Sequence, residues 1–358
     1  MGVGRKDHVN VDQVISLEST YADATVDMYQ QEAIDTQQCH DKFRDVANAS
    51  TSMTTAHPLF NCFRSFDEIA SFLDRLLLSS RPSNRHLLKV PIASTVQGHP
   101  IFGYHWTKPS KGRALLYIQA GVHPREWVSI SSLVYAMVKL ISSPSSKALD
   151  DWDIVFVPVV NVDGYKLTWS APANRLWRKN ARGIDLNRNF GPASYFTATN
   201  DTTSETYSGP YAMSEPETKG IAAYLESIQS RLRGTLDVHT TAGVVVRPLS
   251  VSNAPLQGDD EASMSKVGEA VASAMNNAAR SGGGSSDVPY TSIAGHELYQ
   301  GALYSGTFKD MVYLSLNRTP SLTIELRGES GFMASSGSIR RSGDELVEAI
   351  GAFASQLH

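Results

Sequence analysis

The sequence predicts a single α/β domain, and three observations support that fold class. Apolar runs with the length of buried strands alternate with stretches whose apolar residues recur at helical spacing, which is the pattern of an α/β fold. No internal repeat breaks this alternation, and no linker divides it. The chain has 358 residues, of which 41% are hydrophobic, so it can bury a sizeable core in one unit.

The first 52 residues differ in character from the rest of the chain. They are polar, rich in Asp, Gln, Thr and Ala, and lack a sustained periodicity. We therefore expect residues 1–52 to be an N-terminal arm or the remnant of a pro-segment, and residues 53–358 to be the functional domain. Cys39 and Cys62, the two cysteines of the chain, fit either a disulfide that ties the arm to the domain or two free thiols.

One capped helix and three strands are predicted in the first half of the domain. Ser65 and Glu68 form a capping box, and apolar residues follow at helical spacing as far as Leu76. A second helix is expected after Trp127. The strand-like runs are HLLKVPIA at 86–93, ALLYIQA at 114–120 and WDIVFVPVV at 152–160.

The second half of the domain is predicted to contain three helices and three strands. Two of these helices begin at a Ser-x-x-Glu capping box. A run rich in Gly and Ser is expected to be a flexible loop. The first helix begins at the box of Ser214 and Glu217, the second spans about 261–280, and the third runs from the box of Ser342 and Glu345 to Leu357. The loop is 280–287. The strands are TLDVH at 235–239, VVVRPL at 244–249 and SLTIELR at 321–327.

The charge and hydropathy of the chain limit the classes of partner that it can have. The formal net charge is −4 and no polybasic stretch is present, so we expect no nucleic-acid partner. The longest apolar stretches fall short of the roughly 18 to 20 residues of a membrane span. No signal peptide is visible, but N-x-S/T sequons at Asn48, Asn200 and Asn317 favour a secreted protein. We expect a monomer that acts on small molecules or peptides.

Polar residues stand at the ends of three predicted strands. His123, His239 and Glu325 lie at or just beyond the carboxyl end of an apolar run, where open α/β sheets place their ligands. Glu126 follows His123 in an H-x-x-E pattern, so two imidazoles and one carboxylate are available for a catalytic zinc with an open fourth position. Taken singly, each histidine is typical of a hydrogen-bonded loop or core residue.

The segment NRLWRKNARGIDLNRNF, residues 174–190, is dense in Arg and Asn and also contains apolar anchors, which favours an anion-binding wall over a solvated loop. From about residue 58 to the C-terminus, the chain resembles the zinc metallocarboxypeptidases of the pancreatic carboxypeptidase A type. The motifs that carry the resemblance are HPREW, NVDGY, NRLWRK, GIDLNRNF, SETYSGPYAMSEPET, DVHT, SGTFKD and TIELR, in that order.

This resemblance implies a fold, a cofactor and a catalytic centre. The fold is a mixed, twisted sheet with helices on both faces, and the cofactor is one Zn²⁺ per chain. His123, Glu126 and His239 correspond to the zinc ligands, and Glu325 to the carboxylate that activates the attacking water. Asp185 corresponds to a carboxylate that orients the first zinc histidine.

The resemblance also implies the groups that bind the substrate. Arg178 corresponds to the arginine that stabilises the developing oxyanion, and Arg125 assists along the substrate path. Asn187 and Arg188 correspond to the pair that grips the terminal carboxylate, a planar anion that suits a forked guanidinium. The predicted activity is therefore removal of the C-terminal residue from peptides, proteins or conjugated amino acids.

One family feature does not align directly. The family has a mobile tyrosine four residues before the glycine of its Ser-Gly loop, and counting back from Gly306 reaches Ala302. Tyr304 or Tyr299 takes that role if the loop is remodelled, and we assign Tyr304 to the substrate-binding set. We expect an active enzyme with altered substrate contacts.

Lys309 predicts which C-terminal residue is removed. In SGTFKD it holds the position that corresponds to the floor of the pocket for the terminal side chain. A lysine there favours Glu or Asp and disfavours Arg or Lys, because a desolvated ammonium forms a charge-assisted hydrogen bond with a carboxylate. The alternative is that Lys309 extends past the pocket to solvent. Arg247 either adds to the positive field or is a structural charge at a strand end.

Two other functions stay open on the sequence alone. A deacylase or amidohydrolase for small acyl-amino acids would share the H-x-x-E pattern and the distant histidine. A non-catalytic relative would bind peptide ends without hydrolysing them. The presence of both NRLWRK and LNRN favours the peptidase over the deacylase, and an intact Glu325 disfavours the non-catalytic protein.

Overall fold

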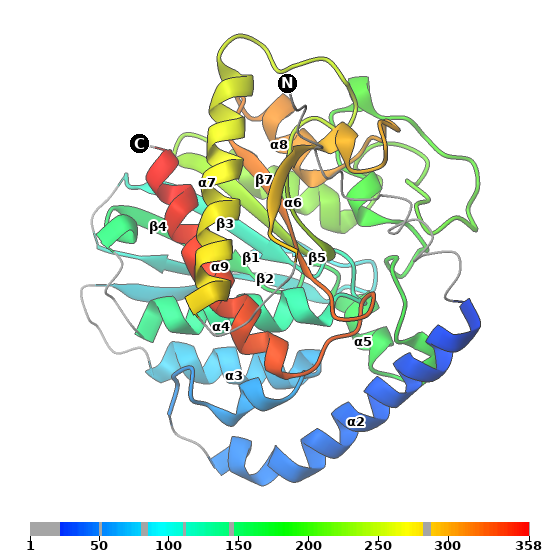
Figure 1. Ribbon diagram of the computed structural model, residues 1–358, viewed down its shortest axis with the longest axis vertical. Coiled ribbons are helices and arrows are strands. Elements are labelled where there is room, and N and C mark those ends of the chain that lie inside the picture. The colour runs from blue at the N-terminus through cyan, green and yellow to red at the C-terminus, as the bar shows by residue number, and fades with distance from the viewer. Residues whose placement is uncertain are drawn as a thin grey trace, which may run out of the picture.

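A mixed β-sheet forms the centre of the fold (Figure 1). The structure, a computed structural model, describes residues 22–49, 52–79, 85–109, 112–142, 147–281 and 288–357, and the sheet within them has seven strands. Their order is β1-β2-β4-β3-β5-β6, with β7 beside β5. The strands are β1 (His86–Ser94), β2 (Pro100–Thr107), β3 (Ala114–Ala120), β4 (Trp152–Val157), β5 (Leu232–Arg247), β6 (Thr291–Ala294) and β7 (Ser321–Arg327).

Helices flank this sheet, as the resemblance implies. Helices α7 and α9 cross the front of the sheet in Figure 1, and α9 also packs on α4. Helix α8 contacts β5 and β7, and α6 contacts β1. Within the described ranges, none of the helices combines the length and apolar character that a bilayer span requires. The helices of the domain are α3 (Phe66–Ser79), α4 (Trp127–Ser142), α5 (Val162–Thr168), α6 (Pro216–Ser227), α7 (Asp260–Ser281), α8 (Phe308–Ser315) and α9 (Gly337–Gln356).

The most buried strands are those that the sequence predicts best. Nearly every residue of β3 and all of β4 are buried, because these two strands pair in parallel and are covered on both faces. Strands β2 and β6 were not predicted. In β2, a glycine and a histidine interrupt the apolar residues and burial varies along the strand, and β6 has only four residues.

Strand β5 doubles back on itself around β7. Along residues 235–241 its partners advance toward Arg327, whereas along residues 244–246 they step back from Glu325. The reversal occurs at Gly243, whose φ of +66° is a left-handed conformation that glycine adopts without strain. The two predicted runs TLDVH and VVVRPL are therefore the two arms of β5. His239 lies near the end of the first arm, shortly before this turn, where it pairs with Glu325 of β7.

Only the first of the three predicted capping boxes is present. The Glu68 carboxylate accepts a hydrogen bond from the Ser65 backbone N–H at 3.0 Å, just before α3. The box predicted at Ser214 is wrong. The Ser214 hydroxyl instead accepts a hydrogen bond from the Asn189 side-chain amide at 2.8 Å, and Glu217 is buried within α6. A tertiary partner has replaced the local cap.

The start predicted for the last helix is also wrong. Helix α9 begins at Gly337, so Ser342 and Glu345 lie inside it rather than at its cap. Glu345 instead receives hydrogen bonds from Arg327 at 3.0 Å and from the Tyr290 hydroxyl at 2.7 Å. These contacts join α9 to the end of β7 and were not visible in local spacing.

The N-terminal arm contains a helix, to which the sequence analysis assigned no secondary structure. Helix α2 (Ala22–Ala49) runs along the outside of the domain at the lower right of Figure 1. A disulfide joins Cys39 to Cys62, with a Cα–Cα distance of 5.9 Å. The His40 ring stacks on Trp169 with centroids 5.4 Å apart. A covalent bond and polar contacts hold α2, which explains the missing apolar stripe. Residues 1–21 and most of the predicted loop, 282–287, lie outside the described residues, as does the Asn48 side chain.

Candidate active site

His123 and Glu126 lie in the turn between β3 and α4. Strand β3 ends at Ala120, Gly121 follows with a φ of +70°, and α4 begins at Trp127. Glycine is suited to this left-handed position, which redirects the chain out of the sheet. The Glu126 backbone N–H then donates to the His123 carbonyl at 3.2 Å. The turn thus presents both side chains at the carboxyl end of a buried strand.

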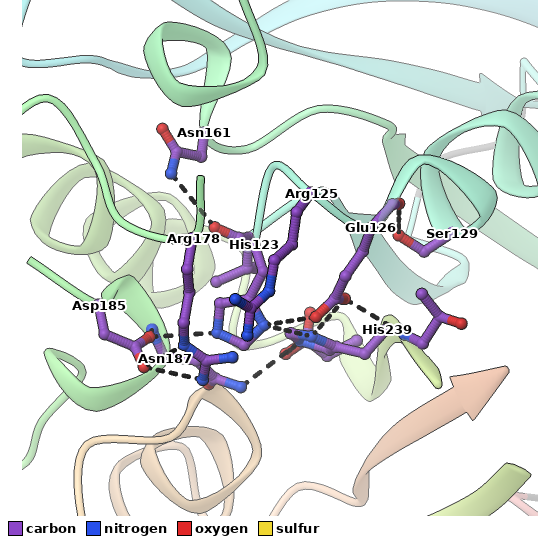
Figure 2. A network of polar contacts seen from close by, with 12 residues as sticks. His123, Arg125, Glu126, Ser129, Asn161, Arg178, Asp185, Asn187 and His239 are labelled. Atoms are coloured by element: carbon purple, nitrogen blue, oxygen red, sulfur yellow. Dashed lines mark hydrogen bonds and ion pairs between the residues drawn. The ribbon is translucent and has the colours of Figure 1, made fainter. Parts of the chain in front are cut away.

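His123, Glu126 and His239 converge on one point (Figure 2). The Nδ1 atom of His123 lies 2.8 Å from Glu126 Oε1, and the Nδ1 atom of His239 lies 3.0 Å from Glu126 Oε2. The two Nδ1 atoms are 3.2 Å apart. All three residues are buried, and they form the one such ligand group among the described residues. Two imidazole nitrogens and one carboxylate are the donor set of a catalytic zinc site.

A carboxylate binds the outer nitrogen of each imidazole. His123 Nε2 lies 3.1 Å from Asp185 Oδ1, and His239 Nε2 lies 2.8 Å from Asp237 Oδ2. This contact fixes the tautomer and ring orientation that leave Nδ1 available for a metal. The sequence analysis found Asp185 but missed Asp237. The sequence did contain a signal for Asp237. It precedes His239 by two residues in a predicted strand, and residues two apart in a strand point to the same face.

Asp237 is in turn held by a buried chain of hydrogen bonds. The Gln119 side-chain amide donates to Asp237 Oδ1 at 3.0 Å, and the Tyr117 hydroxyl donates to Gln119 Oε1 at 3.0 Å. All three side chains are fully buried, on neighbouring strands β3 and β5. The position of the His239 ring is therefore determined by the sheet itself.

The charges around these ligands suit a dication. Burial alone would raise the pKa of Glu126, but His239 and His123 hold that pKa well below its usual range. Burial opposes a charged imidazole, yet Asp237 and Glu126 raise the pKa of His239 well above its usual value. Three carboxylates therefore surround two histidines in a dry site, and a bound metal ion would neutralise the excess negative charge.

Glu325 lies beside the metal ligands. It pairs with His239 across strands β5 and β7, and its side chain lines the same pocket. Burial, opposed by His239 and reinforced by Glu126 and Asp237, raises the pKa of Glu325 to about 7. A dication bound nearby would lower this pKa, because positive charge favours the carboxylate. Glu325 is thus a carboxyl group beside the metal ligands that can accept a proton once a metal is bound.

Arg178 is anchored by the same carboxylate that holds His123. Its Nε and Nη2 atoms donate to Asp185 Oδ2 at 3.0 and 2.9 Å. Burial favours a neutral guanidine, but Asp185 outweighs it and raises the pKa of Arg178 above its usual range. The guanidinium therefore stays charged and rigidly oriented toward the pocket, where it can stabilise negative charge.

Asn187 and Arg188 occupy a short 3-10 turn, Leu186–Arg188. The Asn187 backbone N–H donates to Asp185 Oδ1 at 2.9 Å, and the Asn187 side-chain oxygen accepts from the Phe308 N–H at 2.9 Å. Arg188 extends into the pocket, with its guanidinium 4.7 Å from the centre of the Tyr304 ring. The pair presents an amide and a guanidinium from one rigid turn.

Arg125 and Phe332 form the rim of the site, and we use the word rim for these two residues. The Arg125 guanidinium lies 4.0 Å from the centre of the Phe332 ring, and Phe332 lines the pocket. Arg125 also pairs with Glu205 at 3.1 Å. The guanidinium is therefore at the edge of the site, between an aromatic face and a carboxylate on an exposed loop.

The two tyrosines considered for the mobile role both line the pocket, whereas Ala302 is exposed. The rings of Tyr299 and Tyr304 meet edge to face, with centroids 4.9 Å apart. Gln300 and Gly301 between them have φ values of +52° and +87°, so the chain turns sharply here. This turn brings two aromatic rings to the pocket.

Lys309 lies in the pocket and is 2% exposed. Its ammonium group binds the Ser250 hydroxyl and lies 3.1 Å from Asp310 Oδ1. Burial lowers the pKa of Lys309, and Asp310 opposes that shift. The alternative in which Lys309 extends past the pocket to solvent is therefore wrong. Arg247 does not line the pocket, because it pairs with Glu261 at the start of α7.

A buried two-histidine, one-carboxylate group at the strand ends of an α/β sheet is the arrangement of a metal-dependent hydrolase. A family model described as zinc carboxypeptidase matches residues 70–349, and the chain belongs to this family. It is 29% identical to carboxypeptidase B2 of Bos taurus over 335 residues, which cover 88% of this chain and 75% of that protein. The metal of the family is zinc, so zinc is the cofactor that the three ligands are positioned to bind.

A solved structure and a second relative extend the comparison. The structure of bovine thrombin-activatable fibrinolysis inhibitor in complex with tick carboxypeptidase inhibitor matches with a TM-score of 0.71 and 28% identity. The match covers 83% of this chain and 98% of that one. A protein named inactive metallocarboxypeptidase ecm14, from Talaromyces marneffei, is 33% identical over 216 residues, which cover 54% of this chain and 36% of that protein. Membership of the family therefore does not establish turnover.

Proposed function

We propose that the protein is an active zinc exopeptidase that hydrolyses the last peptide bond of its substrates. The observation that carries this proposal is the buried His123, Glu126 and His239 group with Glu325 beside it, facing a pocket that also contains Arg188. A metal site alone would fit many hydrolases. A metal site next to a carboxylate-binding arginine fits one that recognises a free chain end.

The chain's own residues divide the chemistry among them. His123, Glu126 and His239 would hold the zinc, which would supply Lewis-acid activation of water and of the scissile carbonyl. Glu325 takes the proton from the attacking water and delivers it to the departing amine, because its carboxylate lies in the pocket beside the metal ligands. Arg178, oriented by Asp185, stabilises the negative charge that develops on the carbonyl oxygen.

Recognition of the substrate follows from the remaining groups. Asn187 and Arg188 bind the terminal carboxylate through an amide and a guanidinium. Tyr304, whose ring faces both Arg188 and Lys309, bounds the space for the terminal side chain. Arg125 contacts the chain upstream of the scissile bond, because it lies on the rim.

We further infer a preference for acidic C-terminal residues. The Lys309 ammonium lies 5.6 Å from the centre of the Tyr304 ring and shares the pocket with Arg188. Because Arg188 is engaged by the terminal carboxylate, the Lys309 ammonium is the group that attracts Glu or Asp side chains and repels Arg or Lys. Asp310 already pairs with Lys309, so the attraction is weaker than that of an unpaired lysine.

The rest of the proposal concerns location and partners. The Cys39–Cys62 disulfide suits an oxidising compartment, so we infer that the protein is secreted. We propose that it acts as a monomer, and that residues 53–358 form the catalytic domain to which the arm of residues 1–52 is attached.

The test is a panel of N-blocked dipeptides measured against N-acyl amino acids with the same terminal residues. The exopeptidase releases the last residue of the dipeptides faster, because the dipeptides have an amino-acid residue on the amino side of the scissile bond, where the N-acyl amino acids have only an acyl group. Faster hydrolysis of the N-acyl amino acids would identify a deacylase instead. The relative named inactive favours a third function, binding without turnover, and a zinc-loaded protein that hydrolyses neither set would establish it.

A further inference from the structure

Helix α2 is bound to the domain at two places along its length. The Cys39–Cys62 disulfide joins it to the segment just before α3. Seven residues earlier, two turns along the helix, Glu32 makes an ion pair with Arg175, with Oε2 and Nε 2.6 Å apart. The Arg175 side chain is 1% exposed and that of Glu32 is 10% exposed. A buried charge pair of this kind is costly to break, because either partner alone would be an uncompensated charge.

Arg175 links the helix to both residues of the rim. Its Nη1 atom donates to the backbone carbonyl of Arg125 at 2.6 Å, and its Nη2 atom donates to the backbone carbonyl of Phe332 at 3.3 Å. The guanidinium also stacks on Trp127, 3.9 Å from the ring centre. One arginine thus connects the turn that carries two metal ligands, the segment that carries Phe332, and the N-terminal helix.

Glu32 also contacts residues 329–336 directly, and we call this segment, which carries Phe332, the rim segment. Its Oε1 atom accepts a hydrogen bond from the Ala334 backbone N–H at 3.4 Å. Between α2 and residues 329–336 lies a cavity of about 430 Å³, lined in part by Met28, Phe63 and Met333. The rim segment therefore rests partly over open space rather than on a close-packed core. The Glu32 contacts cross this cavity and help to hold the segment in position.

We propose that α2 stays attached to the domain and supports the rim, and that Glu32 is a positioning residue that holds the rim through Arg175 and Ala334. This rests on the proposed exopeptidase function. When the last residue of a substrate occupies the pocket, the upstream residues of that substrate extend over the rim of Arg125 and Phe332. A helix that is disulfide-bonded to the domain and ion-paired to Arg175 shapes the binding of longer peptides, while a blocked dipeptide is too short to depend on it.

The test compares Glu32→Gln with the parent on an acetylated dipeptide and a six-residue peptide that share their last two residues. We expect KM for the longer peptide to rise about 10-fold with kcat within about twofold, because uniform binding is lost, and both constants for the dipeptide to stay within about twofold. Asp35→Asn is the matched control. It lies one turn further along the same helix and is exposed, with its carboxylate bonded to Gln31 within the helix.

A second variant and a second readout keep the test decisive. The Cys39→Ala, Cys62→Ala double variant releases the covalent tie and should produce the same length-dependent rise in KM. Hydrogen exchange of residues 329–336 should accelerate in Glu32→Gln and not in Asp35→Asn. An equal loss on both peptides, or unchanged exchange in Glu32→Gln, would overturn the proposal. If the parent hydrolyses neither peptide, the exopeptidase function fails on its own, and the exchange comparison alone decides whether Glu32 holds the rim.

Discussion

The metal-binding half of the site and the half that receives the terminal side chain are built in different ways. The metal ligands stand at strand ends, and a buried carboxylate fixes each imidazole. The pocket half is formed largely by a loop that carries Tyr299 and Tyr304, where the backbone turns through two left-handed residues, and by the first turn of α8, which carries Lys309. The difference teaches that the metal half depends on the sheet, whereas the pocket half depends on a loop and the start of a helix.

The largest expected effect comes from removing a metal ligand. His239→Ala should lower zinc content from one to near zero per chain and reduce kcat/KM at least about 10⁴-fold, because water activation and carbonyl polarisation are lost together. Elemental analysis of the dialysed protein and steady-state kinetics measure both quantities. A variant that lacks zinc but retains turnover would show that the metal half does not perform the chemistry.

Glu325→Gln separates catalysis from binding within the metal half. We expect kcat to fall by about 10²- to 10⁴-fold with zinc content unchanged, since the variant removes the base but keeps the ligands. A substrate-competitive inhibitor should bind with a Kd close to that of the parent. Unchanged kcat would mean that another group accepts the proton.

Lys309→Asp tests the pocket half. For a peptide that ends in Glu, kcat/KM should fall by about 10- to 100-fold, the value of a lost charge-assisted hydrogen bond, and an Arg-ending peptide should gain. Lys309→Met is the matched control, because it removes the charge and keeps the length. If the ranking of Glu, Phe and Arg termini is the same in all three proteins, the pocket does not select by charge at this residue.

Asp237→Asn changes metal affinity rather than the chemical step and tests how the sheet supports the metal half. The variant keeps the size of the side chain but weakens its contact with His239, so zinc affinity should fall about 10- to 100-fold while the terminal-residue preference stays unchanged. Competition with a metal indicator gives the affinity. A change in preference instead would mean that the two halves are not separable.

The difference between the metal half and the pocket half also explains which parts of the fold and the site could be predicted from the sequence. The spacing of His123 and Glu126, and the position of His239 in an apolar run, are local patterns that a strand end makes meaningful. Strands β3 and β4 were predicted because both of their faces are buried. These features depend on residues close together in the chain.

Other features depend on distant partners and were missed. Ser214 and Ser342 look like helix caps, but Asn189 binds the first and the second lies within α9. Lys309 binds Ser250, 59 residues away, which no local spacing indicates. Helix α2 lacks an apolar stripe because a disulfide and the Glu32 ion pair attach it.

The central claim is that this chain is a zinc-dependent exopeptidase, and release of the C-terminal residue at defined metal content tests it most directly. The protein is stripped with a chelator, reconstituted with increasing zinc, and assayed on peptides that end in Glu, Phe and Arg. We predict no release from the stripped protein, full activity at one zinc per chain, and the highest kcat/KM for the Glu peptide. Release by the stripped protein, or no release from any peptide at full zinc occupancy, would contradict the claim.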